Sequence, residues 1–174
     1  MSTHTKWLTE KERAAWVQLS AVLELLPSAL DCQLRRDASL TYFGYYVLAM
    51  LSEAPDRILR MSALAAQTNA TLSRLSHVVS RLEDRRLVER FTCPEDGRAT
   101  NVRLTDEGLN RLVDSAPGHV ATVREHVLAP LTTDQVSQLT AITAALLTRL
   151  DPDARMNPRA AVGGEESPDA VRAR

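Results

Sequence analysis

The sequence predicts a mostly α-helical chain of the α+β class, with one short β-hairpin among its helices. Apolar residues recur every three or four positions in stretches at both ends of the chain, as on one face of an α-helix. Apolar and polar residues alternate in two short stretches, 87–93 and 100–104, as in half-buried strands. A chain of 174 residues is long enough for one compact domain, or for a small domain with oligomerisation helices.

The first predicted helix begins after Thr9, whose hydroxyl is suited to capping it, and runs to about Asp37. Glu10 and Glu12 fall in its first turn, where the helix dipole favours acidic side chains. Pro27 is expected to kink this helix. Its apolar stripe consists of Trp16, Leu19, Leu23, Leu26, Leu30 and Leu34.

Three shorter helices are predicted next. The first covers 40–51 and is closed by the turn signal at 53–56, the second covers 61–67, and the third begins after Thr71 and runs to about Arg86. Asn69 is expected to turn the chain between the second and third helices, because asparagine tolerates the left-handed backbone conformation.

A β-hairpin and two longer helices complete the predicted order. The strands 87–93 and 100–104 are joined by a long tip, 94–99. The segment 105–107 caps a helix that is expected to be interrupted at Pro117-Gly118, and a last helix runs from Thr132 or Thr133 to Leu150. The final segment has three prolines and almost no large apolar side chains, so it is expected to be disordered.

Three helices followed by a hairpin form the pattern of a winged helix-turn-helix. The long flanking helices have more apolar surface than so small a domain can cover, which predicts that they pair with a second copy. The expected organisation is an N-terminal dimerisation helix (1–39), a winged helix-turn-helix lobe (40–104), C-terminal dimerisation helices (105–150) and a disordered tail (151–174).

The helix after Thr71 has one apolar and one polar face. The polar face is either an ordinary solvated surface or a surface that reads the major groove of DNA. The second interpretation is favoured because short donors near the N-terminus of a helix and longer cations at its rim can reach base edges. Arg98, between small residues on the hairpin, is suited to a narrow minor groove. The apolar face holds Leu72, Leu75, Val78, Val79 and Leu82, and the polar face Ser73, Arg74, His77, Ser80 and Arg81.

Positive charge is concentrated in the same part of the chain. The whole chain has a net charge of −1, whereas the segment 57–103 contains nine arginines, five carboxylates and a local net charge of +4. Contact with phosphates requires such a local excess.

The segment 59–108 resembles the DNA-binding lobe of the multiple antibiotic resistance regulator (MarR) family, and the flanking helices resemble its dimerisation lobe. The most specific parts are Asp96-Gly97-Arg98 and the following 104–108, with the sequence LTDEG. Arg86 departs from the glycine usual in the family between helix and wing. Asn69 replaces another common glycine.

The resemblance implies a homodimer on a palindromic DNA operator, and a role as a transcriptional regulator that we expect to be a repressor. It implies that Arg98 enters the minor groove and that Asp96 holds Arg98 in place. It also implies that five residues of the recognition helix lie near DNA: Ser73, Arg74, Ser76, His77 and Arg81.

Several aromatic side chains are candidates for a ligand site. The resemblance implies that a small aromatic or phenolic anion binds in the cleft between the lobes and releases the DNA. The alternative, which has at least equal support, is that these side chains pack in the core or at the dimer interface. Arg35 and Arg36 could provide the counter-charge. The candidates are Trp16, Tyr42, Tyr45 and Tyr46, with His119 as part of the pocket wall.

Other classes of function find little support. His119 and His126 share a helix face but lack a third ligand at a fitting spacing, so neither a metal nor another cofactor is expected. Cys32 and Cys93 are expected to be reduced thiols, with redox sensing as a minor alternative.

No catalytic motif is recognisable, so no enzyme is predicted. Without a basic-then-apolar leader the chain is expected to be cytoplasmic and not membrane-bound. A winged helix used only for protein contacts remains the main alternative.

Overall fold

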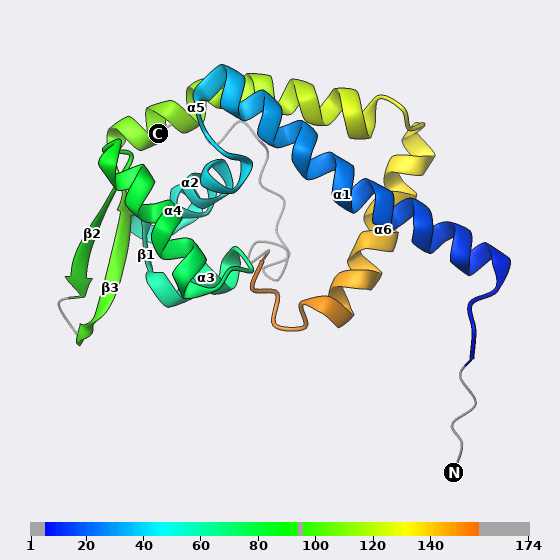
Figure 1. Cartoon of the computed structure of the whole chain (residues 1–174), viewed down its shortest axis with the longest axis horizontal. Helices are drawn as coiled ribbons and strands as arrows, with labels where there is room; N and C mark the ends of the chain where they lie inside the picture. Colours follow the sequence, from blue (N-terminus) through cyan, green and yellow to red (C-terminus); the bar gives the residue numbers. More distant parts are fainter. Residues whose placement is uncertain (1–5, 94–95, 157–174) are drawn as a thin grey trace, which may run out of the picture.

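The computed structural model describes residues 6–93 and 96–156. In Figure 1 a compact lobe of short helices and strands lies at one end, the long helices α1 and α5 extend away from it, and α6 runs from their far side back toward the lobe. α5 packs along the C-terminal part of α1, and β2 and β3 project from the lobe as the wing. The mostly helical α+β class and the winged helix-turn-helix are confirmed.

Helix α1 (Glu10–Ala38) begins with the predicted cap. The Thr9 side chain accepts a hydrogen bond from the Glu12 backbone, and the Thr9 backbone N–H donates to the Glu12 carboxylate at 2.7 Å, which forms a capping box. The helix continues through Pro27 without a break. All four of its buried residues lie at its C-terminal end, between Leu30 and Ala38, so the N-terminal part of its apolar stripe, with Trp16, Leu19 and Leu23, is exposed in one chain.

The helix-turn-helix is built from α2 (Tyr42–Glu53), α3 (Met61–Gln67) and α4 (Leu72–Asp84). Asn69 turns the chain between α3 and α4 with a φ of 46°, as its side chain predicts. The Ala70 N–H donates to the Ala65 carbonyl at 2.9 Å, which closes the end of α3.

The sheet has three antiparallel strands in the order β1-β3-β2, so the two-stranded prediction was incomplete. β1 (Ile58–Arg60), which follows the short helical turn η1 (Pro55–Arg57), pairs with β3 (Asp96–Leu104), and β3 pairs with β2 (Val88–Cys93). A strand of three residues is too short to show an alternating pattern. The long predicted tip was also wrong, because β3 begins at Asp96, and Arg98 therefore lies on a strand near the end of the hairpin.

Helix α5 (Asp106–Val123) corrects another expectation, because it runs through Pro117-Gly118 without interruption. Packing against α1 outweighs the lost hydrogen bond. A Cβ on Gly118 would lie 3.0 Å from the Gln33 Nε2, so the glycine permits close approach to α1. The π-helical turn η2 (Arg124–Leu128) continues the helix.

The last helix, α6 (Thr133–Leu150), is capped by Thr132 in a capping box with Gln135 and has no buried residue. After it, 151–156 form a turn in which the Met156 N–H donates to Asp151 at 2.9 Å. The rest of the predicted disordered tail, 157–174, lies outside the described residues.

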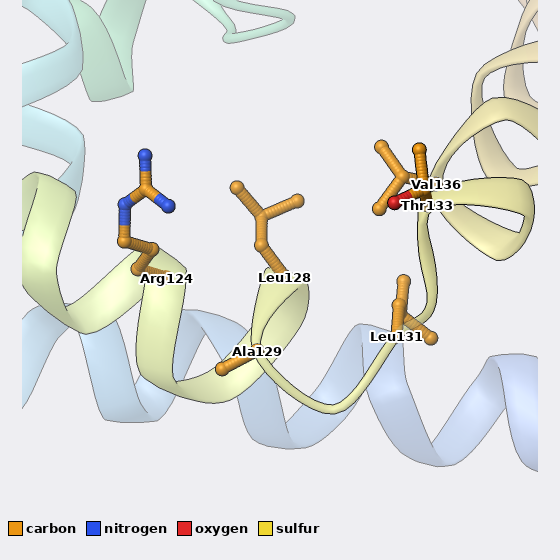
Figure 2. Close-up of a pocket in the computed structure, with 6 residues that line it drawn as sticks. All are labelled: Arg124, Leu128, Ala129, Leu131, Thr133 and Val136. Atoms are coloured by element: carbon orange, nitrogen blue, oxygen red, sulfur yellow. The ribbon is translucent and has the colours of Figure 1, made fainter.

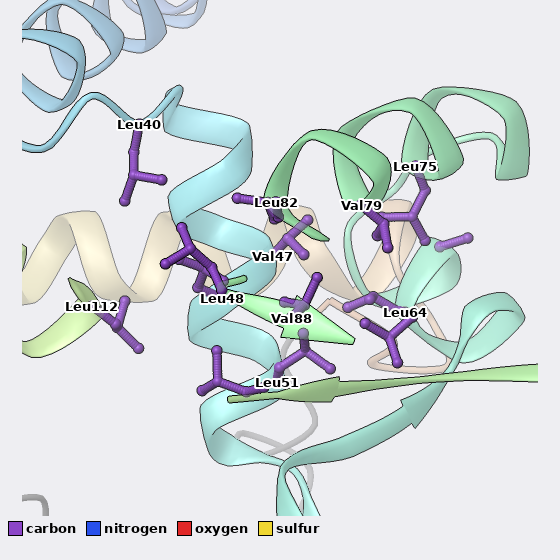
Figure 3. Packing of buried hydrophobic residues seen from close by; sticks show 14 of the residues in the cluster. Leu40, Val47, Leu48, Leu51, Leu64, Leu75, Val79, Leu82, Val88 and Leu112 are labelled. Atoms are coloured by element: carbon purple, nitrogen blue, oxygen red, sulfur yellow. The ribbon is translucent and has the colours of Figure 1, made fainter. Parts of the chain in front are cut away.

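One hydrophobic core holds the winged lobe together. Figure 3 shows side chains from α2, α3, α4 and the sheet meeting in one cluster, including Leu48, Leu64, Val79 and Val88, each at most 1% exposed. Leu112 connects α5 to the same cluster. The positions of α4 and the wing are therefore set by a shared core.

Candidate nucleic-acid interface

Helix α4 presents the predicted polar face to solvent. The Thr71 hydroxyl accepts a hydrogen bond from the Arg74 N–H at 3.2 Å and caps the helix. Leu75, Val79 and Leu82 are buried in the core. Leu72 was assigned to the apolar face but is 55% exposed, because the first turn of α4 extends beyond the core. Ser73, Arg74, His77 and Arg81 are exposed, and Ser76 and Ser80 are half-buried.

Arg74 is held by an aromatic ring from another helix. Its guanidinium carbon lies 4.3 Å from the centroid of the Phe43 ring on α2, which is a cation–π contact. Sequence reasoning missed this pair, because residues 31 positions apart show no periodic relation.

The end of α4 shows how the chain tolerates Arg86 in place of glycine. Arg86 adopts the left-handed conformation, with a φ of 60°. Its N–H donates to the Glu83 carbonyl at 2.8 Å, and the Leu87 N–H donates to the Leu82 carbonyl at 2.9 Å. This is a Schellman motif, so the hydrogen bonds that glycine usually permits are made here by a strained arginine.

At the wing, Asp96 contacts the backbone of Arg98. One carboxylate oxygen accepts from the Arg98 backbone N–H at 3.2 Å, and the other lies 3.7 Å from an Arg60 guanidinium nitrogen. Arg60 also donates to the Cys93 sulfur at 3.7 Å. Asp96 thus stabilises the backbone at the end of the wing, whereas the guanidinium of Arg98 is exposed to solvent.

Ion pairing divides the arginines of 57–103 into two groups. Four are paired with carboxylates: Arg57 with Asp106, Arg60 with Asp96, Arg90 with Glu83, and Arg103 with Glu89. The hydrogen bond and charge of Arg90 hold the pKa of Glu83 below its ordinary value.

The other arginines of this segment are not paired with described carboxylates. Arg85 donates to the Ser39 carbonyl at 2.6 Å. Arg74, Arg81, Arg86 and Arg98 have no carboxylate partner among the described residues, so the uncompensated charge lies on α4, at its end and on the wing.

Three of the five candidate ligand residues come together between α2 and α5. The His119 ring centroid lies 4.5 Å from that of Tyr45 and 6.2 Å from that of Tyr42. Burial raises the pKa of Tyr45 and lowers the pKa of His119. The His119 Nδ1 is buried without a hydrogen-bond partner among the described residues, so this site has polar capacity that the chain itself does not use.

The other two candidates lie elsewhere. The Tyr46 hydroxyl contacts the carbonyls of Gln67 at 3.4 Å and Met156 at 3.3 Å. Trp16 is 58% exposed on the outer part of α1. The suggested counter-charges, Arg35 and Arg36, are already paired with Asp31 and Asp37.

Metal and membrane sites find no support in the described part of the chain. No group of three or more His, Cys, Asp or Glu side chains among residues 6–93 and 96–156 is placed to hold a metal ion. Cys32 is exposed and Cys93 is buried. No described helix is long and apolar enough to span a membrane.

A pocket of about 340 Å³ lies away from α4, at the connection between η2 and α6. Figure 2 shows Arg124 and Leu128 projecting to the same side of η2, with Thr133 and Val136 on the first turn of α6. Leu131 and Ala129 complete its lining, which is mostly apolar with one cation.

Comparisons with known proteins agree with this architecture. The sequence model of the MarR family matches residues 44–99. The crystal structure of Sco3205, a MarR family transcriptional regulator from Streptomyces coelicolor, in complex with DNA, is similar to this chain with 41% sequence identity and a TM-score of 0.81. The alignment covers 87% of this chain and 94% of Sco3205.

A second and a third structure extend the similarity. AbsC, a MarR family transcriptional regulator from Streptomyces coelicolor, is 36% identical with a TM-score of 0.77, over 84% of this chain and 98% of AbsC. CouR from Rhodococcus jostii RHA1 shares the fold at 24% identity and a TM-score of 0.66, over 78% of this chain and 90% of CouR. With 41% identity over nearly the whole length of one family member, this chain belongs to the MarR family of transcriptional regulators.

Proposed function

We propose that this regulator binds a palindromic DNA operator as a homodimer, with α4 in the major groove and the wing in the adjacent minor groove. The observation that carries the proposal is the set of arginines on α4 and the wing that have no carboxylate partner in the described part of the chain, whose net charge as a whole is −1. The presence of DNA in the structure of the 41% identical Sco3205 supports it.

Arg74 and His77 are the proposed base-reading residues. Both are exposed in the first two turns of α4, the part of a recognition helix that meets base edges. Ser73 and Ser76 lie beside them as short donors, and Arg81 lies one turn beyond His77, where it would meet a phosphate.

Arg98 is the proposed minor-groove residue. It is exposed and follows Gly97; among the described residues other than the chain neighbours of Gly97, no atom lies within 4 Å of the position its Cβ would take, so nothing described crowds the wing at this point. Asp96 would act by fixing the Arg98 backbone. A narrow minor groove has the negative potential that attracts an arginine in this position.

The homodimer is proposed from the exposed apolar surface of the long helices. Val22 and Leu23 on α1 are 54% and 59% exposed, and Ile142 on α6 is 58% exposed. Large exposed apolar surfaces mostly mark an interface. Light scattering should give twice the 19.2 kDa mass of one chain, and Ile142→Asp should shift the equilibrium toward monomer while Leu72→Asp does not.

We further propose that the regulator is a repressor released by a small aromatic or phenolic ligand. Tyr42, Tyr45 and His119 would stack on such a ring, and the His119 Nδ1, which has no hydrogen-bond partner among the described residues, would hydrogen-bond to its hydroxyl or carboxylate. A phenolic compound that lowers DNA affinity of the wild type but not of a His119→Phe variant would support this part of the proposal.

The main experiment measures DNA binding by fluorescence anisotropy. Duplexes selected from a randomised library serve as the specific probe and scrambled duplexes as the reference. Arg74→Ala and His77→Ala should each cost about 1 to 3 kcal/mol on the selected duplex and much less on the scrambled one. Arg98→Ala should weaken binding most at A·T-rich flanks and reduce the salt dependence by about one or two phosphate equivalents per dimer.

Arg103→Ala is the matched control for the wing. Arg103 lies on the same strand as Arg98, but it is paired with Glu89 at 2.6 Å and stacks on Phe91 at 4.7 Å, so its loss should leave DNA affinity unchanged. If Arg74→Ala, His77→Ala and Arg98→Ala all bind like wild type, the DNA-contact assignment is wrong. In that case the winged helix would serve protein contacts.

A further inference from the structure

The cation–π contact between α2 and α4 joins a half-buried residue, packed against the core, to an exposed residue of the proposed DNA-binding face. Phe43 is half-buried and packs against the hydrophobic core of the lobe, so the position of its ring is set by that core. Arg74 is exposed, and the centroid of the Phe43 ring lies 4.3 Å from its guanidinium carbon. A flexible cationic side chain is thus placed against a fixed aromatic surface.

Stacking on a ring leaves an arginine able to recognise a base. The N–H groups of a guanidinium lie in its plane and point outward from its edge, so contact through its face leaves donors for the O6 and N7 of guanine. An arginine side chain carries roughly 2 kcal/mol of rotamer entropy, part of which is lost when it binds. A side chain already confined by a ring loses less on binding DNA.

We propose that Phe43 is a positioning residue for DNA recognition, which holds the Arg74 guanidinium over the exposed face of α4 in a conformation ready to read a base. This inference rests on the proposed function, since it assumes that Arg74 contacts DNA. It assigns a role in specificity to a residue of α2 that would not itself touch the DNA.

The surroundings of Phe43 support this role. Its neighbours on α2 face other partners: Tyr42 and Tyr45 contact His119, and Gly44 lies near Leu82. Among the described residues Arg74 has no carboxylate partner, and its guanidinium lies over the Phe43 ring.

A second cation–π pair among the described residues shows a different arrangement. Arg103 stacks on Phe91 at 4.7 Å, but its charge is compensated by Glu89 at 2.6 Å. In the Phe43–Arg74 contact, by contrast, no described carboxylate compensates the charge of Arg74, so this charge is available for DNA.

The test compares Phe43→Leu, Phe43→Met and Phe43→Tyr by anisotropy on selected and scrambled duplexes. Leucine and methionine keep apolar volume but remove the ring, so each should weaken binding to the selected duplex by about two- to fivefold, the value of an exposed cation–π contact. Tyrosine keeps the ring and should retain wild-type affinity. Scrambled-duplex affinity and the salt dependence should be unchanged in all three, since phosphate contacts are untouched.

A double-mutant cycle with Arg74→Ala separates positioning from a general effect on packing. In the Arg74→Ala background, Phe43→Leu should cause no further loss of affinity. Thermal melts identify any variant whose folding is impaired, and Phe43→Met, with its adaptable side chain, provides a second ring-free variant if Phe43→Leu is one of them.

The outcomes distinguish this inference from the proposed function. If Arg74→Ala loses affinity but the folded ring-free variants bind like wild type, or if the two losses add in the double mutant, Phe43 does not position Arg74 and the proposed function stands. If wild type shows no preference for any selected duplex, the proposed function itself fails.

Discussion

Replacing Gly108 by alanine should destabilise the protein strongly, because this glycine lies at a backbone contact between α5 and the start of the wing. A Cβ at this position would lie 2.9 Å from the Leu87 carbonyl carbon, closer still to its oxygen, and 2.7 Å from the Leu104 Cδ1. Atoms of the main chain cannot rotate away as a flexible side chain can. The N-terminus of α5 would have to move.

The size of the effect follows from the contacts that this movement would disturb. The Thr105 N–H donates to the Leu87 carbonyl at 3.2 Å, and the Thr105 hydroxyl donates to the Arg86 carbonyl at 2.7 Å. Losing both costs about 2 kcal/mol, and overpacking adds about 1 to 3 kcal/mol. Alanine regains about 1 kcal/mol of helix propensity. The free energy of unfolding should therefore fall by about 2 to 4 kcal/mol.

Thermal and urea unfolding of Gly108→Ala would measure this loss, with a Tm lower by roughly 5 to 15 °C. Gly118→Ala is the matched control, since it lies in the same helix and gains the same propensity, while its nearest neighbour is the flexible end of Gln33 at 3.0 Å. Gly118→Ala should stay within about 1 kcal/mol of wild type. A Gly108→Ala protein as stable as Gly118→Ala would refute the reasoning.

Three further predictions concern stability and the wing. Arg86→Gly should raise the free energy of unfolding by about 0.5 to 1 kcal/mol because it relieves the left-handed strain, while Arg86→Ala, which keeps the strain, should not. Burial lowers the pKa of His119, so the unfolded chain binds more protons just below about pH 6.5, and stability should fall as the pH drops through this window; His119→Gln should flatten the curve. Asp96→Ala should weaken DNA binding less than Arg98→Ala in anisotropy, because it removes the contacts to the Arg98 backbone and to Arg60 but leaves the Arg98 guanidinium in place; an equal or larger loss would contradict this order.

Most of the helical framework could be predicted from the sequence because its signals are local. The caps at Thr9, Thr71 and Thr105 each satisfy N–H groups within three residues, so the residue type itself marks the helix start. The turn at Asn69 is equally local, since it depends on the backbone preference of one side chain.

The errors arose where distant packing outweighs a local preference. Pro117 predicts a break when α5 is considered alone, but the helix lies against α1 and continues. The three residues of β1 become a strand because β3 offers them hydrogen-bonding partners, with Leu59 opposite Val102. Leu72 is apolar and in phase with the buried face of α4, yet the core does not extend to it.

The candidate site divides in the same way between sequence and tertiary structure. The sequence by itself determined that a helix with hydroxyls, His77 and arginines follows a tight turn, and that positive charge gathers in this segment, because both are properties of neighbouring residues. Only the tertiary structure decided that Arg103 is neutralised by Glu89 across the sheet while Arg74 rests on the ring of Phe43. The physical reason is that ion pairs and stacking depend on a few ångströms between residues far apart in the chain, and strand register and helix packing set those distances.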